Sequence, residues 1–309
     1  MIPNKYPLTV GASSETGYVR NDNQDRMSWA SVPCGQLYII ADGMGGHAGG
    51  AQAAALAIHG LEQYLIAASK NVSIEEAIRV AFEKTNLDVY NKANSGDPAT
   101  DGMGSTAVML LISDHIAKIA HVGDSRAYLY RNGKLRLLTK DHTQVQRMVD
   151  ADILTLEQAR NHPSASILER AIGSRPTVIA DISLDLVLNE GDGILLCSDG
   201  LSGYADDQEI EETMDNSLAP QENVDRLINL ALQKGGKDNV TVQFIRFGKS
   251  SKVCNNNYKD KLKSIFMPAL FLVIVIGAIF AAYWLASNVA EKTRRIDSLK
   301  ITLVSSHHP

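Results

Sequence analysis

Cysteine is scarce in this sequence of 309 residues. The three cysteines, Cys34, Cys197 and Cys254, have neither the number nor the spacing of a disulfide framework or a zinc-binding motif. The first residues contain no apolar run of signal-peptide length. Both absences predict a body that folds in a reducing compartment and exclude a secreted, disulfide-bonded class of protein.

Internal repeats and low-complexity tracts are also absent, and the composition, 45% hydrophobic and 21% charged, predicts a globular protein. Basic residues are few before residue 249. Residues 249–309 hold nine Lys/Arg and three Asp/Glu, which leaves 21 basic and 32 acidic residues in the preceding part. The net charge is therefore −11 there and +6 in the tail. Because the body is acidic, we expect no nucleic acid partner, whereas clustered carboxylates suit divalent cations.

One long apolar run lies near the C-terminus. Residues Ile265–Ala286 are twenty-two positions without a charge, which at about 1.5 Å per residue span the ~30 Å core of a bilayer. Tyr283 and Trp284 lie where interfacial anchors are common, and basic residues flank both ends. The positive-inside rule predicts that the body faces the cytoplasm. The predicted parts are a folded domain at 1–248, a polar linker at 249–264, a single transmembrane helix at 265–286 and a short tail at 287–309.

The body contains short runs that are typical of strands and longer patterns that are typical of helices. The predicted strands are Leu37–Ala41, Thr106–Ile112, Ile116–Val122, Arg126–Arg131, Leu135–Thr139, Ile194–Ser198 and Val240–Phe247. The predicted helices are Gly49–Ser69, Ile74–Asn94 and Gln221–Gln233. Asn132-Gly133 favours a tight hairpin, so at least part of the sheet is antiparallel. Blocks of strands separated by helices predict the α+β class.

Aspartates stand beside these predicted strands. Asp42, Asp124 and Asp199 each follow an apolar run, Asp238 precedes the run VTVQFIRF, and Asp25 lies in the segment RNDNQD. Five carboxylates that converge at one rim of a sheet are suitable ligands for hard divalent cations. Two such cations about 4 Å apart share a bridging hydroxide and bind a phosphoryl group. The alternative for any one aspartate, above all in an Asp-Gly pair, is an ordinary turn.

Eight motifs, in order along the chain, resemble those of the metal-dependent serine/threonine protein phosphatases of type 2C, in their bacterial branch. They are Arg20-Asn21-Asp22-Asn23-Gln24-Asp25, Asp42-Gly43-Met44-Gly45-Gly46-His47, Gly104-Ser105-Thr106, Gly123-Asp124-Ser125-Arg126, Asp141-His142-Thr143, Arg170-Ala171-Ile172-Gly173, Ser198-Asp199-Gly200-Leu201 and Lys237-Asp238-Asn239. The resemblance covers about residues 8–248. It implies two packed antiparallel β-sheets flanked by helices, an α-β-β-α sandwich with metal ions at one end.

The resemblance also implies the ligands of two catalytic Mn²⁺ or Mg²⁺ ions. Asp42 would bridge both ions, and the backbone carbonyl of Gly43 would bind one of them. Asp199 and Asp238 would bind the other ion, and Asp25 would act through metal-bound waters.

The substrate side of the site is implied in the same way. Arg20 would hold the phosphate, so that Arg20, Asp25 and Asp42 form the catalytic set, and Asp124 would bind a third, weaker metal together with Asp199. The segment from Asp141 to Arg170 resembles a mobile flap that touches substrate. Met44 stands where eukaryotic relatives have a histidine. Whether His47 serves as general acid instead, or only precedes the next helix, stays open.

The function that we expect is hydrolysis of phosphoserine and phosphothreonine on proteins by a metal-bridged hydroxide. The partners implied are phosphorylated protein substrates, a Hanks-type kinase that the enzyme opposes, and the bacterial inner membrane. Two alternatives remain: a phosphatase of an anti-sigma-antagonist protein, and an inactive membrane scaffold that binds phosphoproteins.

Overall fold

The computed structural model describes residues 7–45, 49–69 and 71–248, and every structural statement below concerns these residues. The predicted linker, membrane span and tail lie outside them, as does His47. Within the described ranges no helix is long and apolar enough to cross a bilayer.

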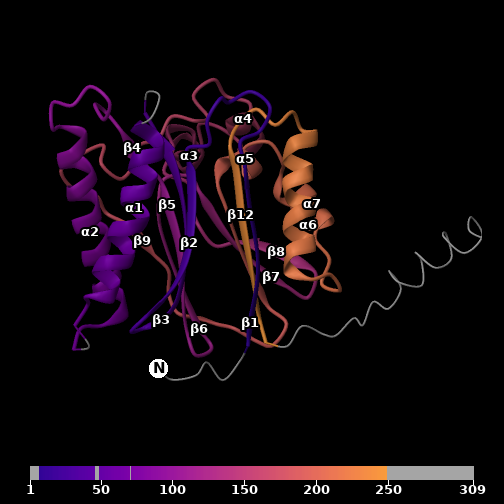
Figure 1. Cartoon of the computed structure of the whole chain (residues 1–309). Helices are drawn as coiled ribbons and strands as arrows, with labels where there is room; N and C mark the ends of the chain where they lie inside the picture. The colour runs from indigo at the N-terminus through magenta and orange to yellow at the C-terminus, as the bar shows by residue number, and fades with distance from the viewer. Residues whose placement is uncertain (1–6, 46–48, 70, 249–309) are drawn as a thin grey trace, which may run out of the picture. The chain divides into compact units, whose positions relative to one another are not determined.

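The centre of the domain is two antiparallel sheets (Figure 1). The five-stranded sheet consists, in spatial order, of β1 (Leu8–Glu15), β12 (Val240–Phe247), β11 (Gly193–Cys197), β7 (Arg126–Arg131) and β8 (Lys134–Leu137). The seven-stranded sheet follows the path β10 (Leu186–Val187), β6 (Ile116–Val122), β5 (Ala107–Ser113), β3 (Gly35–Met44) and β2 (Asp25–Val32), with β4 (Gly104–Ser105) paired to β3 and β9 (Asp181–Ile182) paired to β6.

The two sheets pack face to face through apolar side chains. Ile40, Val108 and Leu110 from the larger sheet meet Leu129 and Ile245 from the smaller one in a single buried cluster. All eight residues of β12 are buried, because a sheet covers one face of this strand and helices cover the other. The polar residues of this strand, Thr241, Gln243 and Arg246, are therefore buried as well.

Helices cover the outer face of each sheet, as Figure 1 shows. The larger sheet is covered by α1 (Gly49–Ile66) and α2 (Ile74–Ala93), where small side chains such as Ala53 and Ala57 let α1 lie close to the sheet. The smaller sheet is covered by α5 (Asp199–Ser202), α6 (Asp207–Thr213) and α7 (Pro220–Gln233). The prediction of an α+β fold with two packed antiparallel sheets flanked by helices is thus confirmed.

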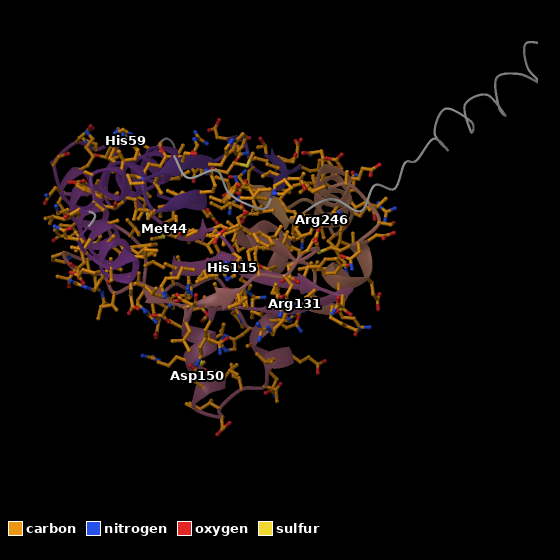
Figure 2. All side chains as sticks on the ribbon, turned by 90° about the horizontal axis from the view of Figure 1, so that it is seen from below. Met44, His59, His115, Arg131, Asp150 and Arg246 are labelled. Carbon is orange, nitrogen blue, oxygen red and sulfur yellow. The ribbon has the colours of Figure 1, made fainter. Side chains whose placement is uncertain are left out.

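Two further helices, α3 (Gln144–Asp150) and α4 (Leu156–Arg160), belong to the segment between Asp141 and Arg170, which we call the flap. Viewed from below, the part of the flap that carries Asp150 projects from the body (Figure 2). The same view places His59 at the periphery, in agreement with its exposed position on α1.

The predicted elements differ from the structure at the sheet edges and in the short elements, since β4, β9, β10 and the helices α3 to α6 were not predicted. β6, β7 and β12 have the predicted bounds, and Asn132 and Gly133 form the predicted hairpin with φ of 54° and 75°. The sequence analysis missed β1 and β2, because both are edge strands with one partner and a weakly apolar pattern. On β2, for example, Trp29 is 61% exposed.

Candidate metal and phosphate site

The predicted metal ligands do meet at one rim of the sandwich. In the larger sheet, β2 begins at Asp25 and runs antiparallel to β3, so that Asp25 and Asp42 are direct partners in the register. The expectation that Asp42 follows its strand was wrong, because β3 continues to Met44. Pairing with β4 explains the extension, since Gly43 and Met44 pair with Ser105 and Gly104.

The ends of strands in the smaller sheet position two more carboxylates, Asp199 and Asp238. β11 and β12 are antiparallel neighbours, so the end of β11 and the start of β12 lie at the same edge. Asp199 follows β11 and begins α5, and Asp238 lies two positions before β12. The Ser198 hydroxyl joins the two sheets at this rim. It donates to Asp25 Oδ2 at 2.7 Å and accepts from the backbone N–H of Thr241 at 3.0 Å.

Asp124 lies in the turn between β6 and β7, where the chain crosses from one sheet to the other. Gly123 makes this turn with φ of 105°, and a Cβ there would lie 2.6 Å from the side chain of Thr106. The Thr106 hydroxyl in turn hydrogen bonds Ser125 Oγ at 2.7 Å and accepts from the N–H of Asp42 at 3.0 Å. One threonine therefore ties the Asp124 turn to the Asp42 backbone.

Asp25 and Asp124 are buried, Asp42, Asp199 and Asp238 are partly buried, and their negative charges repel one another. Burial and the charge of neighbouring carboxylates raise the pKa values of Asp42 and Asp124 well above the ordinary range, and burial followed by the charge of Asp238 raises the pKa of Asp199 to about 7. Burial also raises the pKa of Asp25, although the hydrogen bond from Ser198 opposes it.

Two of these carboxylates have an oxygen that lacks a partner. Among the described residues, Asp25 Oδ1 and Asp199 Oδ1 are buried without a hydrogen-bond partner. A buried oxygen of this kind is costly unless a donor or a cation binds it. The oxygen-only donor set, its excess negative charge and these unpaired atoms fit hard divalent cations.

Arg20 provides positive charge at the same rim. Its Nη2 donates to Asp238 Oδ2 at 2.8 Å, and its side chain is 55% exposed. This hydrogen bond and the charge of Asp238 raise the pKa of Arg20, so the guanidinium stays charged. The loop that carries Arg20 is held by Asn239, which donates to the backbone oxygens of Thr16 and Asp22, each at 3.0 Å.

An open cleft of about 650 Å³ contains these groups. It is lined by Arg20, Asp42, Gly43, Asp124, Asp199 and Asp238 among others. Ser166, Leu168 and Glu169, from the end of the flap, line it as well. Asp25 is 2% exposed and does not line it. The structure thus brings together all seven residues that the sequence analysis assigned to the site.

Gly43 is required by packing at this point. A Cβ on this residue would lie 1.9 Å from the carbonyl oxygen of Gly50, at the start of α1. Any larger residue would push the helix away from the rim that carries Asp42.

The sequence analysis quoted the motifs that contain Thr106, Ser198 and Asn239 but assigned no role to these residues. Their function is to hold other site residues in place. A hydroxyl next to Asp199, a predicted metal ligand, was the available signal for Ser198, but the partner of this hydroxyl, Asp25, is 173 positions away.

The buried and partly buried carboxylates beside an exposed arginine have the chemistry that divalent cations and an anionic group require. Comparison with known proteins agrees. The family described as Protein phosphatase 2C matches residues 18–241, and the chain belongs to this family.

Two curated relatives illustrate the similarity. The serine/threonine protein phosphatase PstP of Mycobacterium tuberculosis is 37% identical over 239 residues, which cover 76% of this chain but 44% of that protein. The chain therefore matches less than half the length of this relative. The serine/threonine phosphatase stp of Listeria monocytogenes is 33% identical over 75% of this chain and 93% of its own length.

Solved structures confirm the fold. The serine/threonine phosphatase of S. agalactiae has a TM-score of 0.72 and 32% identity, over 78% of this chain and 99% of its own. The catalytic domain of PstP in complex with two manganese ions has a TM-score of 0.67 and 33% identity, over 78% of this chain and 99% of that one.

Proposed function

We propose that this chain is a metal-dependent protein phosphatase that hydrolyses phosphoserine and phosphothreonine on proteins. The observation that carries the proposal is the group of buried and partly buried, mutually repelling carboxylates, two of them with unpaired oxygens, at the rim where Arg20 lines the cleft. The family and its named relatives support the same activity.

The ions that this site would hold are Mn²⁺ or Mg²⁺. Asp42, Asp199 and Asp238, with the Gly43 carbonyl and with Asp25 behind them, would hold two ions, and Asp124 with Asp199 would hold a third, weaker one. When bound, such ions supply a water with a lowered pKa and offset the charge of a phosphoryl group.

The protein groups bind and orient the substrate. Arg20 offers a planar fork of donors to phosphate oxygens, and within the described part of the chain Asp238 is the group that accepts a hydrogen bond from it. The Ser198 hydroxyl and the Thr106 hydroxyl hold Asp25 and the Asp42 backbone in place. Because Arg20 is half exposed and the cleft is open, the site suits a phosphorylated side chain on a protein surface.

The physiological setting that we propose is bacterial and membrane-anchored. The enzyme would oppose a Hanks-type kinase. Its catalytic domain would lie in the cytoplasm, tethered to the inner membrane by one helix at 265–286. The uncharged run, its basic flanks and the bacterial relatives support this setting. A periplasm-active reporter fused after Pro309 should be active, and a truncated protein with the reporter after Gly248 should be silent. The opposite pattern would overturn the topology.

The activity is tested with the full chain on a panel of phosphoserine and phosphothreonine peptides. Phosphate release should require Mn²⁺ or Mg²⁺ and stop in EDTA. Asp101→Asn, at an exposed position outside the site, is the matched control for Asp42→Asn, which should be inactive. Binding of phosphopeptides without phosphate release would instead indicate the scaffold. Release from a phosphorylated anti-sigma antagonist alone would indicate the narrower phosphatase.

A further inference from the structure

His142 lies at the N-terminal end of the flap and is 3% exposed. We call this end the first foot of the flap and the C-terminal end its second foot. Its backbone oxygen accepts from the N–H of Glu169, at the second foot, at 2.7 Å. One residue further in, Thr143 pairs with Leu168. The two ends of the flap are therefore joined to each other at His142.

His142 also forms two hydrogen bonds with the turn that carries Asp124. The His142 N–H donates to the Gly123 oxygen at 3.0 Å, and the Gly123 N–H donates to Nδ1 of the His142 ring at 3.1 Å. On its other side Gly123 lies against Thr106. The turn is held between the ring of His142 and the side chain of Thr106. The turn therefore has little freedom to move relative to Asp42.

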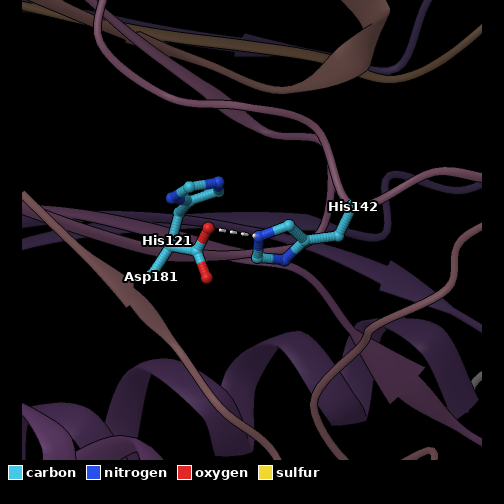
Figure 3. Close-up of side chains that lie close together, drawn as sticks. All are labelled: His121, His142 and Asp181. Atoms are coloured by element: carbon cyan, nitrogen blue, oxygen red, sulfur yellow. Dashed lines mark ion pairs between the residues drawn. The ribbon is translucent and has the colours of Figure 1, made fainter. Parts of the chain in front are cut away.

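These contacts decide which ring nitrogen carries the proton. Because Nδ1 accepts from Gly123, the proton of the neutral ring lies on Nε2. Nε2 faces Asp181 Oδ2 at 3.3 Å, a long contact that Figure 3 shows, and Asp181 Oδ1 accepts from Arg170 at 2.6 Å. Burial, followed by the neighbouring His121, lowers the pKa of His142 to about 4, in agreement with a neutral ring.

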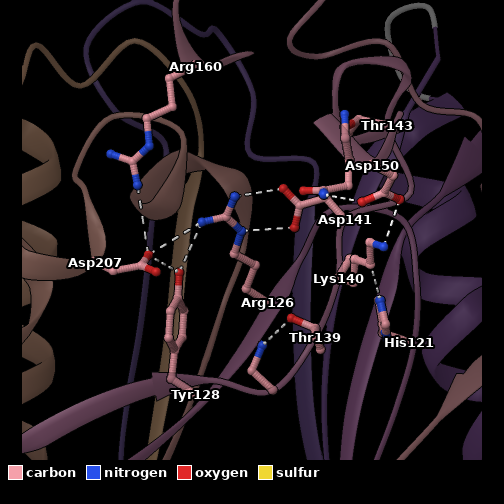
Figure 4. A network of polar contacts seen from close by, with 12 residues as sticks. His121, Arg126, Tyr128, Thr139, Lys140, Asp141, Thr143, Asp150, Arg160 and Asp207 are labelled. Carbon is pink, nitrogen blue, oxygen red and sulfur yellow. Dashed lines mark hydrogen bonds and ion pairs between the residues drawn. The ribbon is translucent and has the colours of Figure 1, made fainter. Parts of the chain in front are cut away.

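The group formed by His121, His142 and Asp181 is not a second cation site, although their ligand atoms lie within 4.8 Å of one another. A cation on Nε2 of His142 would move the proton to Nδ1, against the N–H of Gly123. The two rings are also stacked, with centroids 4.5 Å apart, and His121 Nε2 bonds the backbone oxygen of Lys140 at 2.8 Å (Figures 3 and 4).

We propose that His142 is a positioning residue for phosphate hydrolysis. Its Nδ1 holds the Gly123 N–H and thereby sets where the Asp124 carboxylate lies in the cleft, and its backbone fixes the same turn to both feet of the flap. The kinetic test of this proposal depends on the proposed phosphatase function, whereas the contact between His142 and Gly123 does not.

The test uses two side chains that each reproduce half of the histidine. In His142→Asn the amide oxygen takes the place of Nδ1 and accepts from Gly123, whereas in His142→Gln the amide nitrogen takes the place of Nε2 and faces Asp181. We expect kcat of the full chain to fall about tenfold in His142→Gln, the effect of one lost hydrogen bond, and by less than about threefold in His142→Asn. KM should stay unchanged in both, because the backbone contacts of the flap feet remain.

Two further readouts separate positioning from stability. Calorimetric titration of the full chain with Mn²⁺ should show weaker binding of the last ion in His142→Gln than in His142→Asn. His59→Gln, on the exposed face of α1, should match the wild-type chain in both measurements. Equal losses in the Asn and Gln variants, in step with their melting temperatures, would overturn the proposal.

A spectroscopic measurement needs no variant. In the full chain labelled with ¹⁵N-histidine, without added metal, the His142 ring should show an unprotonated Nδ1 and a protonated Nε2. A proton on Nδ1 would overturn the proposal, since Gly123 would then have no acceptor there. If the wild-type chain releases no phosphate at all, the proposed function fails while this tautomer still reports on the contact.

Discussion

The interior of the sandwich and its metal-binding rim are built from the same strands but have opposite energetics. On β3, Ile39 and Ile40 are fully buried among apolar side chains and stabilise the fold. Two residues further along the same strand, burial and then the charge of neighbouring carboxylates raise the pKa of Asp42. The interior favours the folded chain by itself, whereas the rim opposes folding until positive charge binds there. The comparison teaches that this fold is stable enough to support a destabilised site at its edge.

The largest effect is expected from Asp42→Asn. Loss of a carboxylate that would hold the cations should lower kcat/KM for a phosphopeptide by about 10³-fold or more. The same substitution removes repulsion among the rim carboxylates, so in EDTA the melting temperature should rise. Steady-state kinetics and calorimetry in EDTA check both outcomes. A variant that is less stable in EDTA would break the proposed contrast between rim and interior.

Leu110→Ala in the interior should lower stability and leave activity unchanged, the reverse of the effects of Asp42→Asn. Leu110 on β5 is fully buried between the sheets, so the substitution should cost about 2–5 kcal/mol of the free energy of unfolding. Urea unfolding with Mn²⁺ present measures this cost. Activity per folded molecule should be unchanged, and a proportionate loss of activity would show that the interior and the site are not independent.

The pH dependence of stability sharpens the comparison further. Because the pKa of Asp199 is about 7 when folded and 3.8 is its ordinary value, the folded protein binds more protons than the unfolded chain between these values. In EDTA the contribution of the rim to the free energy of unfolding should therefore fall as the pH rises from 4 to 7. Urea unfolding across this range, with EDTA and with Mn²⁺, measures it. Equal slopes in both would contradict the prediction.

The smallest effect is expected from Arg20→Lys. Lysine keeps the charge but loses the planar fork, so kcat/KM should fall about tenfold through a higher KM. The free energy of unfolding should change by less than about 1 kcal/mol, because the Arg20 side chain in the ion pair with Asp238 is 55% exposed and lysine keeps the charge. Arg79→Lys, in an exposed ion pair on α2, is the control that should leave KM unchanged.

Elements that depend on local sequence were predictable, and elements or contacts that depend on distant partners were not. β6, β7 and β12 had the predicted bounds, since their burial and their turns are encoded locally. β1 and β2 were missed because edge strands depend on a distant partner. The rim aspartates were found through motif order, and their partners Ser198, Thr106 and Asn239 were not assigned, because hydrogen bonds across 64 to 223 positions leave no periodic pattern.

By itself the sequence determined the α+β class, the acidic body and the long apolar run at 265–286, since composition and periodicity are local properties of a chain. The seven site residues were predicted from the order of motifs that resemble those of a known family. Only the tertiary structure decided that Asp25 and Asp42 face each other across paired strands, that Ser198 joins the two sheets, and that His142 grips the Asp124 turn. Side chains far apart in the chain meet at this rim because two sheets pack together, and their burial there, together with the charge of their neighbours, raises their pKa values.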